Sequence, residues 1–342
     1  MARIATTLSD ILDSVKQRMV DVGYNSSTIY FGLDPDELPI KQTAPLIAKI
    51  CPGSQSATNP ETNLFKGTLE IVLWIQNNLD QAQWSDFGLN DLDYGVYPQG
   101  DKALFEILNL HDLLNGNGSN VLLRPIRWLS TDEPKKEGLW IATKYTFEIA
   151  WENSASYVQE TMLPVIDSRI DLILASLKAR MVSEAVYTDH SCFIGLEQPK
   201  NKIPPNFGHY GVISPTPNEV YSSETMITRT TINVDSYTYL GLDTGGKSDV
   251  QLTSFFYGIY PKIDVINEAL NWYMLVDDDA SNSIIIQPLI LRKIEKPVVE
   301  KRWARTRLVY DVVYVYETEI TVIPPVGPIH AAYSPAFSYA WS

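Results

Sequence analysis

The sequence predicts an α+β fold in which a helix–antiparallel sheet–helix unit occurs twice in tandem and is followed by an extended C-terminal arm. Three observations lead to this expectation. One amphipathic segment near the start recurs in the second half of the chain, strand-like runs follow one another without helices between them, and the last residues are rich in proline and aromatic side chains. Successive strands favour antiparallel pairing, because parallel neighbours need long crossover connections. We expect a first repeat over 1–155, a second over 156–323 and an arm over 324–342.

The evidence for duplication is a constant spacing between matching residues. Residues 11–21 and 173–183 are identical at seven of eleven positions. Further matches follow at offsets of 162 or 163, and they include Gly32-Leu33 with Gly195-Leu196, Tyr97-Pro98 with Tyr260-Pro261, and Trp140 with Trp303. Each unit has the size of an ordinary domain.

Each unit opens with an amphipathic helix. Over Leu8–Val22 the apolar residues recur every three or four positions, which indicates a helix with one buried face. Thr7 or Ser9 can cap its first turn. In the second unit Pro164 lies near the first turn, and the apolar positions are Ile166, Ile170, Ile173, Leu174, Leu177 and Met181.

The remaining elements are expected in the same order in both units. Short strands are predicted at Thr28–Leu33, Leu46–Cys51 and Thr68–Gln76, and again at Ser191–Leu196, Tyr210–Ile213 and Met226–Leu240. A second helix follows, at Gln99–Leu114 and at Ile263–Leu275. Two closing strands end each unit, at Val121–Ser130 with Leu139–Glu152, and at Ser283–Ile294 with Trp303–Ile323. The last strand is fairly apolar on both faces, so we expect both to be covered.

Composition excludes several classes of protein. The chain has 342 residues, 45% of them hydrophobic, and a formal net charge of −14, which disfavours non-specific binding to nucleic acid or to anionic lipid. The two cysteines, Cys51 and Cys192, are expected to be reduced core thiols. The first residues lack the apolar region of a secretory signal, and no apolar run approaches the ~20 residues of a membrane helix. We expect a soluble protein without a membrane partner.

One segment formally fits a phosphate-binding loop. Gly241-Leu242-Asp243-Thr244-Gly245-Gly246-Lys247-Ser248 matches G-x-x-x-x-G-K-[ST]. The motif needs a long helix after it, but residues 249–260 are poor helix formers and are followed directly by Pro261. The first repeat also has no Gly-Gly-Lys-Ser. We interpret the segment as a glycine-rich hairpin turn, and keep nucleotide binding through Gly246-Lys247-Ser248 as a minor alternative.

Other chemical candidates are weaker. His190 and Cys192 form no nucleophile–base pair by spacing, and Asp243-Thr244-Gly245 is a three-residue match to an aspartic-protease loop. The acidic run Asp277–Asn282 lacks the glycine and glutamate of a calcium loop, so it indicates a turn. Asp86, Asp91 and Asp93 are expected on a wet surface loop. We therefore expect no catalytic, cofactor-binding or metal-binding residues, and no enzymatic activity.

The C-terminal arm is the remaining candidate for a contact site. Residues 323–329 carry three prolines and cannot form a helix or a strand pair. Beyond them Tyr333, Phe337, Tyr339 and Trp341 alternate with small residues. We expect these aromatics to dock on a neighbouring subunit, with a disordered terminus as the alternative.

This order of elements resembles the tail-terminator and tail-completion (neck) proteins of tailed bacteriophages. The resemblance rests on the helix Leu8–Val22, the strand run Thr28–Gln76, the helix Gln99–Leu114 and the closing strands Val121–Glu152, all repeated from Pro164 to Ile323. The family has no diagnostic short motif, and its members usually carry one copy of the unit rather than two.

The resemblance implies a structural protein of the virion, assembled in the cytoplasm of the bacterial host, that forms a homo-oligomeric ring around the DNA channel. With a duplicated unit, the ring would contain three chains or six. Its partners would be the tail tube, the head connector or stopper, and the sheath if the tail is contractile. DNA would pass without specific binding, which suits an acidic protein. The alternative is another virion ring component, such as a baseplate or head-completion adaptor.

Overall fold

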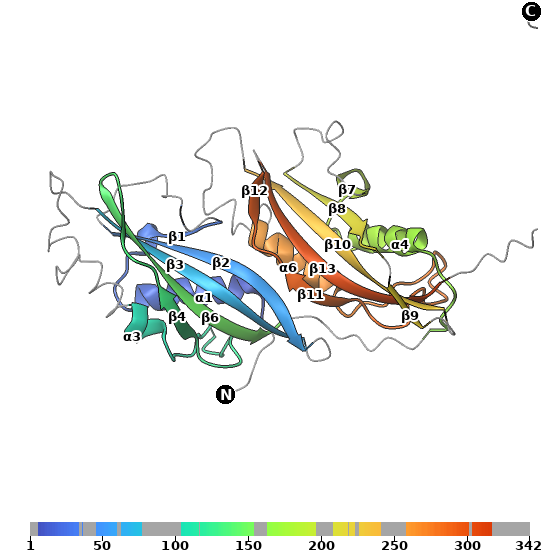
Figure 1. Ribbon diagram of the computed structural model, residues 1–342, viewed down its shortest axis with the longest axis horizontal. Coiled ribbons are helices and arrows are strands. Elements are labelled where there is room, and N and C mark those ends of the chain that lie inside the picture. The colour runs from blue at the N-terminus through green and yellow to red at the C-terminus, as the bar shows by residue number, and fades with distance from the viewer. Residues whose placement is uncertain are drawn as a thin grey trace, which may run out of the picture.

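The computed structural model describes residues 6–33, 36, 46–59, 63–76, 104–115, 117–153, 163–195, 208–217, 219–222, 226–240, 258–300 and 303–316. Over these residues the chain is a mixed α+β protein whose strands form one thirteen-stranded sheet (Figure 1). The predicted boundary between the repeats, at residues 155 and 156, and the predicted arm, 324–342, lie outside the described residues.

The sheet consists of two sets of strands that lie side by side. The first half-sheet contains β1 (Ile29–Phe31), β2 (Leu46–Asn59), β3 (Leu64–Gln76), β4 (Arg127–Thr131), β5 (Lys135–Glu137) and β6 (Trp140–Glu152). The second half-sheet contains β7 (Cys192–Ile194), β8 (His209–Pro215), β9 (Glu219–Ser222), β10 (Ile227–Tyr239), β11 (Ile290–Ile294), β12 (Val298–Glu300) and β13 (Trp303–Val315).

Strand order is the same in both half-sheets. The continuous path is β4-β6-β3-β2-β11-β13-β10-β8-β7, with β1 beside β2. Pairing is antiparallel except for β1 with β2 and β7 with β8, as expected for strands that follow one another along the chain. Strand β7 starts at Cys192 and matches β1, which starts at Ile29. The other strands of the second half-sheet match those of the first at the same offset along the sequence, and β2 corresponds to β8 and β9 together.

The counterparts agree even in irregular backbone. The ladder of β4 with β6 is interrupted at Leu129, and that of β11 with β13 at Arg292, which is the matching position of the second half-sheet. Left-handed backbone, which costs energy for most L-residues, recurs at matching places. The matched pairs with positive φ are Gly23 with Ala185, Asn63 with Met226, Leu110 with Trp272, and Gly118 with Ala280.

The first helix forms as predicted. Helix α1 (Leu8–Asp21) begins at the Thr7 N-cap, whose hydroxyl and backbone exchange hydrogen bonds with Asp10 in a capping box. Its counterpart α4 (Ile170–Ser183) begins later than predicted, after Arg169. Pro164 and Ile166 precede this helix, because the backbone around them pairs with strand residues: the Ile166 N–H donates to the Ser283 carbonyl.

The second predicted helix ends earlier than expected in both units. Helix α3 covers Glu106–Leu108, and α6 covers Ile259–Leu270, so that α6 also begins before the predicted Ile263. Both helices end because a residue just after each of them bonds to the residue that precedes the next strand, β4 or β11. The Leu110 N–H donates to the Ile126 carbonyl, and the Trp272 N–H donates to the Leu289 carbonyl. Both donors have positive φ, which a continuing helix does not allow. The predicted helical residues 99–103 lie outside the described residues.

The predicted strands need several corrections. Strand β2 continues beyond Cys51, to Asn59. Strands β4 and β11 begin later than predicted, because Pro125 and Pro288 supply no N–H donor just before them. The short strands β5, β9 and β12 were not predicted, and β3 begins at Leu64 rather than at Thr68. Strand β13 ends at Val315, and the predicted continuation over 317–323 lies outside the described residues.

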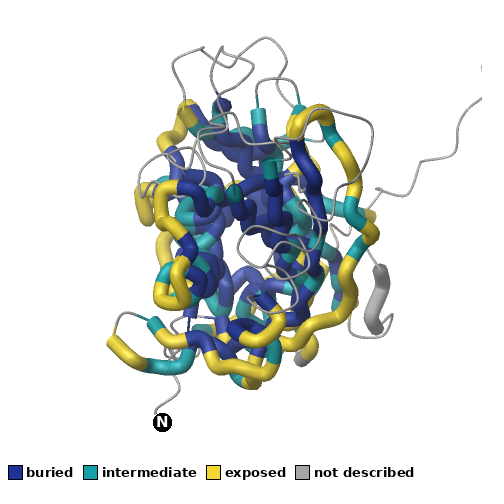
Figure 2. The backbone as a smooth tube through the Cα atoms, turned by 90° about the vertical axis from the view of Figure 1, so that its left-hand side faces the viewer, coloured by how far each residue is buried: buried dark blue, intermediate teal, exposed yellow. Residues whose placement is uncertain are grey.

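One hydrophobic core extends through both half-sheets. Buried residues of α1, α4 and α6 form a single cluster with one face of the strands, and α1 and α6 lie behind the strands in Figure 1. Figure 2 shows this buried centre surrounded by exposed segments. We expected both faces of β13 to be covered, but its other face is covered only in part. Val309 and Val313 are half-buried there, and Asp311 is buried by ion pairs with Arg229 and Arg292.

The core contains a buried hydroxyl that lacks a hydrogen bond within the described part of the chain, that of Tyr310. Its counterpart in the first half-sheet is Phe147, which is also fully buried. Tyr310→Phe is therefore expected to leave the free energy of unfolding unchanged or to raise it by about 1 kcal/mol, since it removes an unsatisfied polar group. The matched control Phe147→Tyr should lower it. Urea unfolding measures both, and a loss in Tyr310→Phe would contradict the prediction.

Candidate functional site: the joint between the half-sheets

The most distinctive site in the described structure is the joint between the two half-sheets. Its backbone part is an antiparallel pairing of β2 with β11, in which Ser56 faces Lys293 and Gln55 faces Ile294. The Gln55 side chain is fully buried beside this pairing, and its amide donates to the Gly53 carbonyl at 2.9 Å. A Cβ atom at Gly67 would lie 1.7 Å from the Gln55 amide oxygen, so this close packing requires glycine there.

Polar side chains hold the joint together on either side of this pairing. The Lys296 ammonium forms an ion pair with Glu70 at 3.2 Å, and the Lys296 backbone N–H donates to the Ser54 hydroxyl. The Asn271 side-chain amide donates to the Asn63 side-chain oxygen at 2.8 Å. Each interaction connects residues more than 200 positions apart, so the joint depends on the complete fold.

On the face of the sheet that carries the helices, α6 forms hydrogen bonds with residues near the start of the chain. The Tyr260 hydroxyl donates to the Gly32 carbonyl at 2.7 Å. The Asp264 carboxylate accepts the backbone N–H groups of Leu8 at 3.2 Å and Ser9 at 3.3 Å, and also the Ser9 hydroxyl. It therefore satisfies donors at the N-terminus of α1. Burial nevertheless raises the pKa of Asp264 to about 7, against the opposing effect of these hydrogen bonds.

The joint brings together unlike edges. The β2 edge of the first half-sheet meets β11, which is the counterpart of β4 and not of β2. The two half-sheets therefore follow one another head to tail. At one end of the described sheet lies β4, the counterpart of β11. At the other end lie β7, which pairs with β8, and the short strand β9, which pairs with β10 and corresponds to the part of β2 that meets β11.

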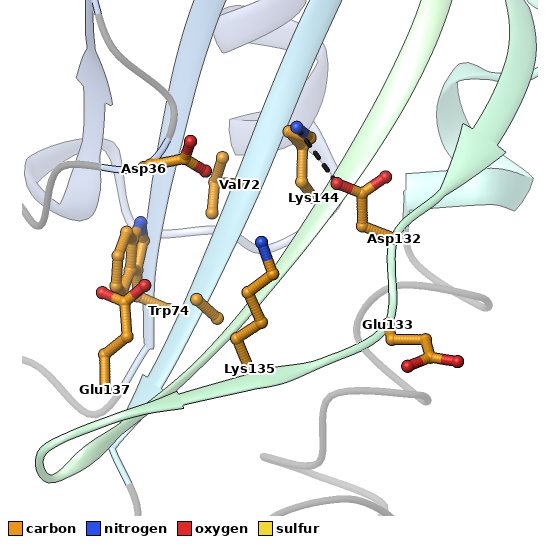
Figure 3. Close-up of a pocket in the computed structure, with 9 residues that line it drawn as sticks. Asp36, Val72, Trp74, Asp132, Glu133, Lys135, Glu137 and Lys144 are labelled. Atoms are coloured by element: carbon orange, nitrogen blue, oxygen red, sulfur yellow. Dashed lines mark ion pairs between the residues drawn. The ribbon is translucent and has the colours of Figure 1, made fainter.

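A first hollow, on the outer face of β3 and β6, is too small for a ligand. It holds about 20 Å³, roughly the space of one water molecule. Trp74 and Lys135 lie along it, and the Lys144 ammonium pairs with Asp132 (Figure 3). The hydrogen bond from Lys144 to Asp132 raises the pKa of Lys144, so this lysine remains a cation.

A second, more open hollow of about 530 Å³ lies between the end of α4 and Lys262. Burial lowers the pKa of Lys262 to about 8, but its ammonium donates to the Val186 carbonyl and lies 4.8 Å from the centre of the Tyr187 ring. Thr188 and Ser191 bond to each other in a capping box. The fold itself uses these polar groups, so the hollow presents no catalytic pair among the residues described there.

The candidates from the sequence are resolved in part. Burial raises the pKa of the Cys192 thiol to about 12, which disfavours a reactive thiolate, and Cys51 is also a buried free thiol. Asp277 accepts hydrogen bonds from Ser281 and Asn282 and closes a turn, as predicted. The Gly246-Lys247-Ser248 segment, the aspartates at 86, 91 and 93, and the arm residues Tyr333, Phe337, Tyr339 and Trp341 lie outside the described residues.

Comparison with known proteins adds no identification: no family model matches the chain, and no curated protein matches it. Within the described residues, no three His, Cys, Asp or Glu side chains are grouped as a metal site would require. In the same part of the chain, no helix has the length and apolar character needed to cross a membrane.

The residues of the joint did not stand out in the sequence, where Asp264, Asn271 and Lys296 look like ordinary surface polar residues. One signal was available in the sequence, when its two halves are compared at the offset of 162 or 163 residues. Asp264 then corresponds to Lys102, and Lys296 corresponds to Glu133, so both positions reverse their charge between the halves. A charge reversal between matched positions indicates that the two positions have different surroundings.

Proposed function

We propose that this protein is a ring-forming structural subunit of the neck of a tailed bacteriophage, a tail terminator that caps the tail tube and joins it to the head connector. One observation carries the assembly part of the proposal: two equivalent half-sheets join through unlike edges. Such heterologous contacts produce rings when the rotation closes, and open filaments when it does not. The phage assignment rests on the resemblance of the element order.

We further propose that the chain is a tandem duplication of a helix–antiparallel sheet–helix unit. The nearly constant offset between matching strands, the common strand order and the matched positive-φ positions support it. Unrelated units that only share composition would have no reason to share a ladder interruption at Leu129 and Arg292. With two units per chain, three chains would make a ring of six units, and six chains a ring of twelve or a double layer.

The charge of the chain fits a channel through which DNA passes. A net charge of −14 gives a surface that repels phosphate, so that DNA slides without being held. The proposed partners are copies of the chain itself, the tail tube and the head connector or stopper, with a sheath if the tail contracts. We propose the virion as its location and no enzymatic step.

The experiment is native mass spectrometry combined with negative-stain imaging of the full-length protein over a range of concentrations. We expect a closed ring of three or six chains with an open centre. A protein that is monomeric at every concentration would overturn the assembly part of the proposal. Pull-down of the tail-tube protein by the assembled ring then tests the neck assignment.

A further inference from the structure

This inference rests on the proposed ring assembly. We propose that the joint inside the chain is repeated between chains, so that β4 of one copy pairs with β9 of the next copy. The occupant of the β4 edge is therefore a second copy of this protein. In this arrangement the sheet continues from one chain to the next through main-chain hydrogen bonds, as in other contacts made by adding a strand to a sheet edge.

Strand β4 has the local structure of β11, which already makes such a joint. Both strands pair with a long counterpart strand, β6 or β13, and both ladders are interrupted at the equivalent residue. Both are also anchored alike. The Asn109 side chain accepts the Trp128 N–H at 2.9 Å, and the Asn271 side chain accepts the Leu291 N–H at 2.9 Å. The outward edge of β4 is thus shaped like the edge of β11 that binds β2.

The surface beside β4 is apolar where its counterpart is buried. Trp128 is 38% exposed, whereas its counterpart Leu291 is 1% exposed. Phe105 is 42% exposed, whereas Asn267, at its matching position, is 3% exposed. Phe105 and Trp128 pack edge to face, with ring centres 5.6 Å apart, and form a small aromatic surface at this end. All five residues of β4 are exposed. This exposure is expected for an edge strand whose partner is another copy of the chain.

The opposite end of the sheet offers an apolar surface of the same kind. Met226 is 39% exposed beside the start of β10, and the Tyr316 N–H donates to its carbonyl. Tyr316 is 42% exposed, whereas its counterpart Asn153 is 5% exposed. Met226 itself is the counterpart of Asn63, which bonds to Asn271 across the joint. Exposed apolar groups at both ends can therefore cover each other when two copies meet.

The two kinds of joint would differ in chemistry. Inside the chain, the contact between Asn63 and Asn271 is a hydrogen bond. Between chains, the matching positions are Met226 and Asn109, flanked by the aromatic side chains of Phe105, Trp128 and Tyr316. This difference keeps the two joints specific: a chain closes its own joint through polar contacts, and meets its neighbour through apolar ones.

Register makes the proposal testable by disulfide cross-linking. Because Ser56 faces Lys293 in the joint, Glu219 of one copy should face Ser130 of the next. Directly opposed residues on antiparallel strands have Cβ atoms about 4.5–5.5 Å apart, close enough for a disulfide with small adjustment. The native thiols of Cys51 and Cys192 are buried and do not compete. The test variant is the double substitution Ser130→Cys, Glu219→Cys in the full-length protein.

Under mild oxidation, the double variant should form disulfide-linked multimers up to the ring size seen by native mass spectrometry. The matched control is Ser130→Cys, Tyr221→Cys, which moves one thiol two residues along β9, to the residue at which the ladder of β9 with β10 is interrupted. The control should cross-link at least tenfold more slowly. Equal cross-linking of the two variants, or none in either while wild-type rings form, would overturn the proposed pairing and leave ring assembly standing.

A second variant tests the same surface without cysteines. Leu129 is 44% exposed on β4, and Leu129→Glu should weaken assembly at least tenfold by placing a charge in the joint between chains. Leu139→Glu is the control, because Leu139 is 64% exposed at the turn between β5 and β6, away from that edge. Analytical ultracentrifugation measures both. Equal assembly of the two variants would overturn the inference, whereas a monomeric wild type would overturn the proposed ring itself.

Discussion

Asp311→Ala is expected to lower the free energy of unfolding by about 3–5 kcal/mol, a large effect for a single substitution. The side chain of Asp311 is 3% exposed, and its carboxylate pairs with the guanidinium groups of both Arg229 and Arg292. These cations come from β10 and β11, the two neighbours of β13. Without the carboxylate two arginine charges remain close together on either side of the strand, and their side chains are only 36% and 31% exposed.

The matched control is Glu148→Ala at the equivalent position of the first half-sheet. Glu148 pairs with Lys66 and Arg124, whose side chains are 47% and 49% exposed. Both cations can turn into water when their partner is removed, so the loss should be clearly smaller than for Asp311→Ala. Urea unfolding monitored by circular dichroism compares the two. If both substitutions lowered the free energy of unfolding equally, the exposure of the cations would not explain the effect, and the prediction would be wrong.

The second large effect concerns pH. Burial raises the pKa of Asp264 to about 7 in the folded chain, above its ordinary value near 3.8. Between these two values the folded protein binds a proton that the unfolded chain does not, so stability must decrease as the pH rises through that range. Asp264 keeps some contact with water, and we expect a loss on the order of 1–2 kcal/mol between pH 5 and pH 8.

Asp264→Asn should remove this pH dependence, because asparagine does not titrate in this range. Its single side-chain oxygen can accept from either Leu8 or Ser9, so the variant should lose stability equally at every pH. Thermal unfolding at pH 5, 6, 7 and 8 measures it. The control is Asp189→Asn: an ion pair with Lys178 lowers the pKa of Asp189, so its contribution is lost only as the pH falls below about 3.8. A wild-type stability that rises from pH 5 to pH 8 would contradict the assignment.

Much of the fold could be predicted because local signals agree with it. The apolar spacing of α1 is encoded within one short segment and is confirmed, and of the two candidate caps, Thr7 and Ser9, the structure has Thr7. The α+β class follows from consecutive strand-like runs, which pair as antiparallel neighbours. The turn at Asp277 was also recognisable, because its hydrogen bonds join residues at most five positions apart.

Predictions went wrong where long-range contacts overrode local preference. The stretch up to Leu114 has the periodicity of a helix, but Leu110 bonds to Ile126 and leaves the helical region. Ile166 fits the stripe of α4, but its N–H is taken by Ser283. In both places a hydrogen bond to a residue far along the chain replaces one that a helix would have supplied, and spacing alone does not reveal such competition.

Local signals in the sequence were enough for the α+β class, the positions of most elements and the constant offset between matching residues, because periodicity, caps and turn residues act over short distances. Three features became visible only in the folded chain: β2 pairs with β11, unlike edges meet, and Asp264 lies against the start of α1. Those contacts join residues separated by more than 200 positions. Their free energy comes from burial and hydrogen bonding that exist only once both half-sheets have formed.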